Sequence, residues 1–302
     1  TPKPSSAASD VYKRQIYSHR QPFLINPFLE KFTESTGIKT NVVYSTKGLA
    51  QRLKAEGKNS PADLVLTVDI GRLYIYRDMD LLASIESEKL DKNIPPHLKS
   101  NDNTWFGLSK RARIIVTSKE RVPAGTINNI EDLSNPRWKN KICSRPGSHV
   151  YNRALLASII AEHGAKKAEE WAKGLVSNLA RRPQGNDRAQ VKAIYQGQCD
   201  IAIIYNYYFG KLKFSEDKTQ REWIKGLRLI FPNQELNDRG AHINISGGGV
   251  AKYSKNKEAA VKLLEFLSEK EAQNLYGQIN FEYPINPKIE PNSELKSWGS
   301  FR

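Results

Sequence analysis

Short apolar runs alternate along the chain with longer stretches in which apolar residues recur at helical spacing. This alternation is typical of an α/β protein. The predicted strands lie at 16–18, 40–44, 63–68, 112–117, 199–205, 227–231 and 246–251. The predicted helices lie at 22–35, 47–56, 151–162, 165–177 and 187–196, and residues 255–277 are expected to form two consecutive helices.

Two adjacent tyrosines, Tyr207 and Tyr208, follow directly on the predicted strand 199–205. Because neighbours along a strand point to opposite faces, their side chains converge on one object only where the strand has given way to a turn or a helix start. Paired phenols at the end of a buried strand suggest a ligand. A packing cluster with Tyr205 and Phe209 is the alternative, and the local sequence leaves it open.

The length and composition of the chain predict two domains of ordinary size. With 302 residues, 39% apolar and 26% charged, the chain exceeds what one core usually serves. Extended segments at 108–117 and 227–233 are predicted to cross between two lobes, which makes the first domain discontinuous. No apolar run reaches the roughly 18 residues that a membrane span needs, so we expect the chain not to span a membrane.

The net charge of +15 would by itself favour a nucleic-acid partner. The basic residues are scattered among acidic ones, as in 86–92, 166–170 and 255–270, instead of forming one stripe with interleaved aromatic side chains. We therefore expect a solvated basic surface and no nucleic-acid binding.

The two cysteines, Cys143 and Cys199, each lie eight residues before a tyrosine, Tyr151 and Tyr207 respectively. Neither belongs to a Cys-x-x-Cys or Cys/His cluster, which argues against a zinc site. In an oxidising compartment they can form one disulfide, and two buried thiols are the alternative. Sequence alone leaves both open.

Residues 1–15 do not read like the rest of the chain. The stretch from Ser5 to Gln15 closely resembles the in-frame translation of a common sequencing-library adapter, and a natural flexible arm is the alternative. We therefore exclude residues 1–15 from fold reasoning. On the adapter interpretation the natural amino terminus lay upstream of Ile16, and the absence of a signal peptide says nothing about localisation.

The sequence contains no nucleotide-binding glycine loop, no Gly-x-Ser-x-Gly elbow and no grouping of its five histidines, so nothing specifies an enzyme. The remaining candidate chemistry is phenol and guanidinium. Phenolate is a hard anionic oxygen donor suited to a trivalent cation such as Fe(III). Because phenols titrate near ~10, deprotonation at neutral pH needs the metal and nearby cations. The candidate cations are Arg20, Arg111 and Arg113.

Seven ordered blocks of the chain resemble the periplasmic ferric-ion-binding proteins of bacterial ABC transporters. They are Tyr17 to Pro22, Ser60 to Asp69, Trp105 to Arg113, Arg145 to Asn152, Asn206 to Lys211, Asn244 to Gly247 and Glu282 to Pro284. The resemblance covers nearly the whole chain after Ile16, and seven blocks in order are far more specific than any one of them.

The resemblance implies the fold of a type II periplasmic binding protein. Two α/β lobes with mixed sheets are joined by two hinge strands and hold the ligand in the cleft. Lobe 1 is expected to comprise 16–112 and 232–283, and lobe 2 to comprise 113–231 and 284–302. The implied function is to capture Fe(III) in the periplasm and deliver it to an inner-membrane ABC permease, without chemical turnover. We expect a monomer.

The resemblance also implies a ligand set. The iron-binding phenols of the family match Tyr151, Tyr207 and Tyr208, and a synergistic anion, usually carbonate, is held beside the metal. Many relatives carry a His-Tyr pair where this chain has Gln21 and Pro22, so a ligand from the first lobe is missing. The chain therefore resembles the subgroup that uses three tyrosines and an anion.

The same comparison makes other polar residues candidates. Arg20 and Gln21 are expected to contact the anion, and Arg111 is expected to balance charge. Asp69 ends a predicted strand and is a further candidate, with a helix-capping role as its alternative. A binding protein of the same fold for another anion, a polyamine or chelated iron is the competing hypothesis, and a basic nucleic-acid-binding protein is the competitor from another class.

Overall fold

The computed structural model describes residues 14–302, and these fold into two compact units. Unit 1 contains the residues up to Lys110 together with Asn244–Asn292, and unit 2 contains Arg111–Ile243 and Ser293–Arg302. Both units are mixed α/β, as the alternating pattern predicted. Residues 1–13, which make up most of the predicted adapter segment, lie outside the described residues.

Unit 1 is built on a mixed sheet with the strand order β2-β1-β3-β8. Strand β1 pairs in parallel with both β2 and β3, whereas β8 runs antiparallel to β3. The strands are β1 (Arg14–Ser18), β2 (Thr40–Tyr44), β3 (Ala62–Thr67), β8 (Ile243–Val250) and β9 (Tyr283–Pro284). The helices are α2 (Pro22–Thr36), α3 (Leu49–Glu56), α4 (Ile70–Asp78), α5 (Glu88–Asn93), α11 (Lys257–Ser268) and α12 (Lys270–Asn280), with short 3-10 turns η1 (Gly57–Asn59) and η2 (Pro96–Leu98).

Three consecutive glycines in β8 allow neighbouring backbone to approach closely. A Cβ atom on Gly247 would lie 2.5 Å from the carbonyl oxygen of Phe106, and one on Gly248 would lie 2.7 Å from that of Val65. No real Cβ atom tolerates such contacts, so only glycine fits at these two positions. The run belongs to the packing of the sheet, not to a phosphate-binding loop.

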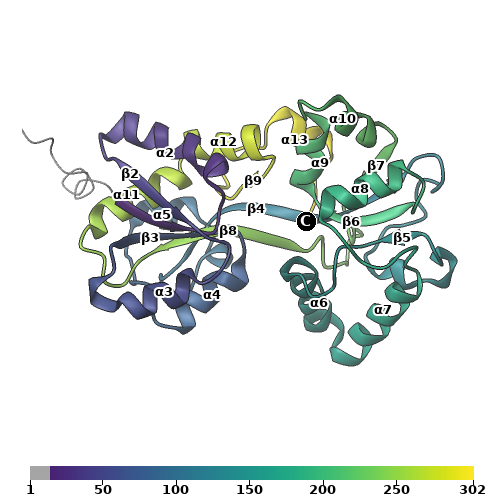
Figure 1. Ribbon diagram of the computed structural model, residues 1–302, viewed down its shortest axis with the longest axis horizontal. Helices are drawn as coiled ribbons and strands as arrows, with labels where there is room; N and C mark the ends of the chain where they lie inside the picture. Colours follow the sequence, from purple (N-terminus) through teal and green to yellow (C-terminus); the bar gives the residue numbers. More distant parts are fainter. Residues whose placement is uncertain (1–13) are drawn as a thin grey trace, which may run out of the picture. The chain divides into compact units, whose positions relative to one another are not determined.

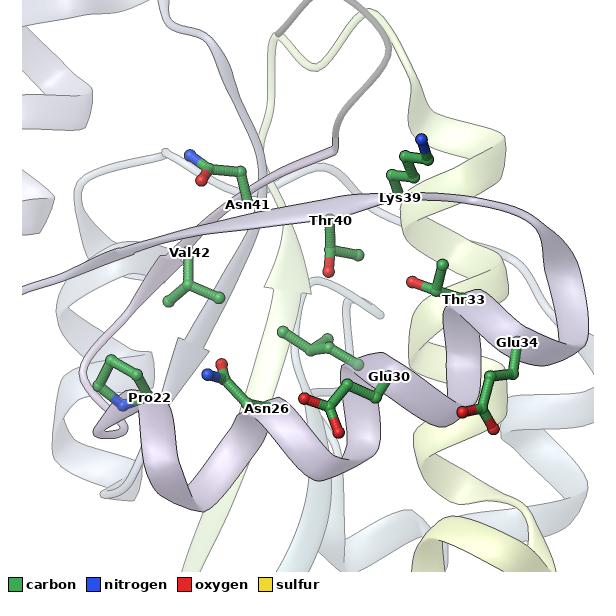
Figure 2. Close-up of a pocket in the computed structure, with 10 residues that line it drawn as sticks. Pro22, Asn26, Glu30, Thr33, Glu34, Lys39, Thr40, Asn41 and Val42 are labelled. Carbon is green, nitrogen blue, oxygen red and sulfur yellow. The ribbon is translucent and has the colours of Figure 1, made fainter. Parts of the chain in front are cut away.

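A groove in unit 1 lies beside the edge strand β2, between this strand and α2 (Figure 2). It is lined by Glu30 and Glu34 from the helix, by Thr40 from the strand and by Lys39 just before the strand. None of the residues that the sequence singled out for binding lies in this groove.

Unit 2 has a sheet whose two faces are both covered by helices (Figure 1). Strand β6 alternates strictly: Ile201 and Ile203 pack in the cluster with α6 and α7, and Ala202 and Ile204 pack in the cluster with α8, α9 and α10. Burial on both faces explains why this strand reads as a continuous apolar run.

Strand β6 lies between β4 and β5, antiparallel to β4 and parallel to β5. The strands of unit 2 are the second half of β4 (Phe106–Ser118), β5 (Ile142–Cys143), β6 (Ile201–Tyr205) and β7 (Leu227–Ile230). Its helices are α6 (Val150–His163), α7 (Ala165–Ser177), α8 (Asp187–Tyr195), α9 (Asn206–Lys213), α10 (Lys218–Lys225) and α13 (Ser293–Ser297), with 3-10 turns η3 (Glu131–Ser134) and η4 (Pro136–Trp138).

The unit boundaries correct the predicted lobes. Residues 111, 112 and 232–243 belong to unit 2, and residues 284–292 belong to unit 1. The predicted crossing at 108–117 does lie in β4, but the one at 227–233 was wrong, because β7 pairs with β4 inside unit 2. The chain passes from unit 2 to unit 1 at the start of β8 instead. An apolar edge strand with loops on both sides has the same sequence pattern as a crossing segment.

Arg14 and Gln15 also differ from the expectation. They were excluded with the adapter-like segment, yet they are the first two residues of β1 and pair with Thr40 and Asn41. Because strand pairing uses main-chain groups, a strand extends over residues of any origin where the neighbouring strand offers partners.

The two cysteines form a disulfide, which resolves the alternative that sequence left open. Cys143 and Cys199 have Cα atoms 5.8 Å apart and are both buried. The bond joins the last residue of β5 to the segment just before β6, so it links two neighbouring parallel strands at one end.

Replacing both cysteines by alanine is expected to lower the stability of the protein substantially. The bond closes a loop of 56 residues, for which chain entropy gives a stabilisation of about 4 kcal/mol. Urea unfolding of the double variant measures the loss. Wild-type protein unfolded in strong reductant is the control and should approach the variant, and an unchanged midpoint would contradict the structural role of the bond.

Within residues 14–302, no helix is both long and apolar enough to cross a membrane. The main helices and strands predicted from the pattern are confirmed, including the division of 255–277 into α11 and α12.

Candidate metal centre

The three tyrosines that the sequence singled out all stand in the first turn of a helix in unit 2. Tyr151 is the second residue of α6, where the side chain of the N-cap residue His149 accepts a hydrogen bond from the Tyr151 amide at 3.2 Å. Tyr207 and Tyr208 lie in the first turn of α9, which begins directly after β6. The strand therefore gives way to a helix start at the pair, as the sequence predicted.

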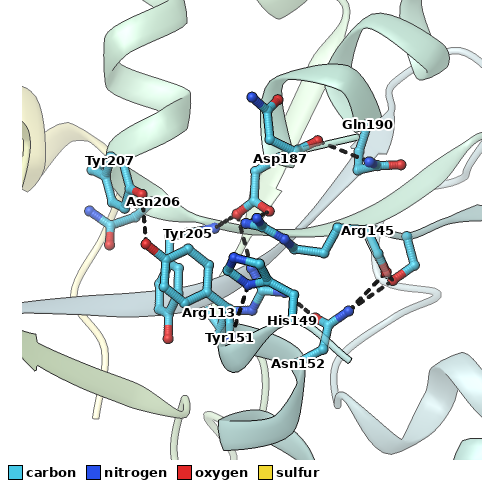
Figure 3. Close-up of polar contacts among 12 residues, drawn as sticks. Arg113, Arg145, His149, Tyr151, Asn152, Asp187, Gln190, Tyr205, Asn206 and Tyr207 are labelled. Atoms are coloured by element: carbon cyan, nitrogen blue, oxygen red, sulfur yellow. Dashed lines mark hydrogen bonds and ion pairs between the residues drawn. The ribbon is translucent and has the colours of Figure 1, made fainter. Parts of the chain in front are cut away.

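The hydroxyl groups of Tyr151 and Tyr207 meet, with their oxygens 3.4 Å apart (Figure 3). The rings of Tyr207 and Tyr208 stack with centroids 4.2 Å apart, so the third phenol lies beside Tyr207. Two oxygens bonded to one metal ion at about 2 Å each are separated by at most about 4 Å. The spacing of the first two phenols therefore suits a shared cation.

Tyr205 packs against the rings of both Tyr151 and Tyr207. It is fully buried, its ring packs edge-on against Tyr151 at 4.7 Å, and it lies nearly parallel to Tyr207 at 6.1 Å. Phe209 is likewise part of the core. Tyr205 and Phe209 are therefore core packing residues. Tyr151, Tyr207 and Tyr208 are each only half-buried.

Three buried arginines face the aromatic cluster. The Arg111 guanidinium lies 5.7 Å from the ring centre of Tyr151 and 5.0 Å from that of Tyr205. Arg113 lies 4.8 Å from the Tyr205 ring, and Arg145 lies 4.8 Å from the Tyr151 ring. Cations over aromatic faces are attracted by the ring quadrupole, and they also stabilise nearby phenolates.

Asp187 is the acidic partner of this cluster. It is fully buried at the start of α8 and forms ion pairs with Arg113 and Arg145 at 3.0 and 2.9 Å. Sequence reasoning missed both Asp187 and Arg145. An aspartate in the first turn of a helix is common, and nothing in the sequence indicates that this one points inward.

Burial raises the pKa of Tyr207 well above its usual range near 10, and the neighbouring phenols Tyr151 and Tyr208 add to the effect, whereas Arg111 opposes it. Burial also raises the pKa of Tyr208, with further contributions from Tyr151 and Asp187, and the Tyr207 hydroxyl and Arg145 oppose the rise. Tyr207 and Tyr208 are therefore protonated at neutral pH when no cation is bound.

The candidates Arg20 and Gln21 both lie in unit 1 and differ in burial. Arg20 is buried, and one of its terminal nitrogens donates to Glu282 at 2.7 Å and to Ser246 at 2.8 Å. Gln21 is the exposed N-cap residue of α2 and makes no side-chain capping bond. The charge of Arg20 is thus already matched by a carboxylate.

Asp69 caps a helix, which was the alternative weighed for it. One of its carboxylate oxygens accepts from the Gly71 amide at 2.9 Å, and the other accepts from the Asn244 side chain at 2.7 Å. It is the N-cap residue of α4. Both oxygens therefore have partners that fix the chain locally.

Histidine, cysteine and carboxylate side chains do not gather in threes as a metal site anywhere in residues 14–302. The candidate oxygen donors in unit 2 are therefore the tyrosine hydroxyls, of which those of Tyr151 and Tyr207 meet.

Comparison with known proteins places the chain among transport binding proteins. The profile of the bacterial extracellular solute-binding protein family matches residues 28–302. Iron uptake protein A1 of Synechocystis sp. is 41% identical over 288 residues, which covers 95% of this chain and 79% of that protein.

Solved structures agree with this placement. The ferric iron-binding protein A of Mannheimia haemolytica, solved in an open conformation, superposes with a TM-score of 0.89 at 45% identity, covering 96% of this chain and 90% of that one. A Trichodesmium protein solved with iron and citrate gives 0.90 at 43% identity, covering 96% and 92%. These matches confirm the predicted type II periplasmic binding protein fold. The chain therefore belongs to the bacterial extracellular solute-binding protein family.

Proposed function

We propose that this protein captures Fe(III) through the phenolate oxygens of Tyr151, Tyr207 and Tyr208. The observation that carries the proposal is the 3.4 Å approach of the Tyr151 and Tyr207 hydroxyls above buried arginines. Three phenolates match the charge of Fe(III) and are the hard donors that it prefers. Relatives named for iron uptake and ferric iron binding support the same cargo.

The charges around the phenols favour an anion as a further ligand. Fe(III) with three phenolates is neutral, while the buried Arg113 and Arg145 carry two positive charges against the single negative charge of Asp187 that pairs with both. The filled site would therefore keep a surplus of positive charge in a poorly solvated place. Carbonate, which carries two negative charges, is the anion that we propose.

Arg111 is the proposed source of charge balance, since it faces the ring of Tyr151 and lowers the pKa of Tyr207. Arg20 and Gln21 stay proposed anion contacts from unit 1. Of these two, Gln21 is exposed, whereas Arg20 would have to share its charge with Glu282.

The proposed physiological role is capture in the periplasm by a monomer that hands iron to an inner-membrane ABC permease. Binding is reversible coordination without chemical turnover. Protonation of the phenolates, loss of the anion or reduction to Fe(II), for which phenolate is a poorer partner, would release the metal.

Iron-free protein given one equivalent of Fe(III) and bicarbonate is expected to develop a visible absorption band. The band arises because an electron is promoted from phenolate to iron, which requires direct coordination. Absorption titration checks the stoichiometry, and Ga(III), which has no such transition, is the control metal. Stoichiometric binding of Fe(III) without colour would contradict the tyrosine site.

Chelated iron is the second candidate cargo, because a Trichodesmium relative was solved with both iron and citrate. Titration with ferric citrate and with Fe(III) plus bicarbonate separates the two. If the chelate is the cargo, radiolabelled citrate stays on the protein with one citrate per iron after gel filtration. If citrate only delivers the metal, the label elutes separately from the protein.

A further inference from the structure

We propose that Asp187 is a positioning residue for the metal centre, which fixes Arg113 and Arg145 against the phenols and ties together the segments that carry Tyr151 and Tyr207. The inference rests on the proposed function, which it deepens. Asp187 is itself not a ligand candidate, because its contacts are with two guanidinium groups and a main-chain amide.

The carboxylate of Asp187 connects three segments that are distant in sequence. One oxygen accepts from Arg145, in the loop between β5 and α6, at 2.9 Å. The other accepts from Arg113 on β4 at 3.0 Å and from the Tyr205 amide at the end of β6 at 2.9 Å. With no exposed surface, Asp187 has no water to replace these partners.

Two of the three partners of Asp187 lie within a few residues of a phenol (Figure 3). Arg145 lies over the ring of Tyr151, six residues later in the chain. The Tyr205 amide stands two residues before Tyr207. The Asp187 carboxylate therefore fixes the segment that carries one phenol relative to the segment that carries the other.

A second set of hydrogen bonds closes the network on the side of α6. Arg113 donates through its other terminal nitrogen to the side chain of Asn152 at 2.6 Å, and Asn152 donates to the carbonyl oxygen of Arg145 at 3.0 Å. Asn152 is the residue directly after Tyr151. The start of α6 is thus held by the same two arginines that Asp187 orients.

The positive charges of Arg113 and Arg145 also require the carboxylate of Asp187. Two buried guanidinium groups repel each other unless a carboxylate lies between them. An asparagine at position 187 keeps the shape and one acceptor oxygen, but it removes the charge and places an NH2 group against a cation. One arginine then moves away, and the phenol beside it loses its fixed orientation.

Asp200 provides a matched control in the same unit. It is also buried and also paired with two cations, Arg121 at 2.5 Å and Lys141 at 2.9 Å. It lies just before β6, at the end of the strand opposite Tyr207. Asp200→Asn therefore removes a buried carboxylate from the far end of β6, where its two cations are partly exposed.

The test compares Asp187→Asn and Asp200→Asn with wild type by competition for Fe(III) against a chelator, by the visible band, and by tyrosine near-UV circular dichroism of the iron-free proteins. Asp187→Asn is expected to bind Fe(III) 10- to 100-fold more weakly, the range for an outer-sphere partner, with a displaced band and altered circular dichroism. Asp200→Asn is expected to stay within about twofold of wild type in affinity and to keep both spectra.

An Asp187→Asn variant that folds and matches wild type in affinity and in both spectra would overturn the inference, as would equal losses in both variants. If Asp187→Asn does not fold, Arg145→Lys, which keeps the charge but loses the planar fork, must show the same weakening and band displacement, and wild-type behaviour there overturns the inference. A wild type that stays colourless with Fe(III) refutes the proposed function instead, and circular dichroism of the iron-free variants then still decides whether Asp187 orders the phenols.

Discussion

Replacing Tyr207 and Tyr208 together by phenylalanine is expected to abolish stoichiometric Fe(III) binding and the visible band. The double change removes two of the three proposed phenolates and leaves one donor with a negative charge against a trivalent cation. Each single change should already weaken binding by more than the roughly 10- to 100-fold that loss of an outer-sphere partner costs. Competition with a chelator of known iron affinity measures the losses.

The three positions should also differ in a defined order. Tyr151 and Tyr207 have the two hydroxyls that meet at 3.4 Å, so we expect their single phenylalanine variants to lose more affinity than Tyr208→Phe. Tyr195→Phe is the control, because Tyr195 is an exposed tyrosine of the same unit. Wild-type binding by Tyr207→Phe/Tyr208→Phe would exclude the proposed ligand set.

Iron binding is expected to release protons and to weaken steeply in acid. Burial raises the pKa of both Tyr207 and Tyr208, so these phenols hold their protons at pH 7 in the empty site. The iron-bound state lacks those protons, so its formation is favoured as pH rises and reversed as pH falls. Each proton displaced changes the apparent affinity about tenfold per pH unit, so Tyr207 and Tyr208 together give about a hundredfold.

A proton count tests this linkage directly. Fe(III) is added as a chelate to weakly buffered protein at a fixed bicarbonate concentration, and the protons released are titrated after correction for those that the freed chelator takes up. Wild type should release one proton more than Tyr208→Phe, whatever the protonation of the anion, because the two proteins differ by one phenol. Equal counts for the two proteins would mean that Tyr208 does not bind as a phenolate.

Much of the fold could be predicted from the sequence because its strands and longer helices bury a regular face. β6 is apolar throughout since helices cover both faces of its sheet, and α2 begins at a proline and ends at Thr36, just before Gly37. The short helices α4, α5 and α10 were missed, because so few turns of helix leave little periodic signal.

The site was predictable only in part. Tyr207 and Tyr208 stood out because they come just after an apolar strand. A helix that begins where a strand ends places its first side chains at the edge of the sheet. Asp187 did not stand out, since its role depends on Arg113 and Arg145, which lie 74 and 42 residues away along the chain. Similarly, Arg20 looked available for an anion until its partner Glu282, 262 residues distant, was located. Long-range partners of buried charges leave no local pattern.

The disulfide joins the two chain segments that lead to Tyr151 and Tyr207. From Cys143 the chain runs eight residues to Tyr151, and from Cys199 it runs eight residues to Tyr207, so the two arms have equal length. Their ends lie 3.4 Å apart, which makes the bridge and the two arms a closed frame with the hydroxyl pair opposite the covalent bond. The arm from Cys143 runs mainly through the loop before α6, whereas the arm from Cys199 contains the core strand β6. The spacing of the two hydroxyls therefore depends on the same sheet that forms the core of unit 2.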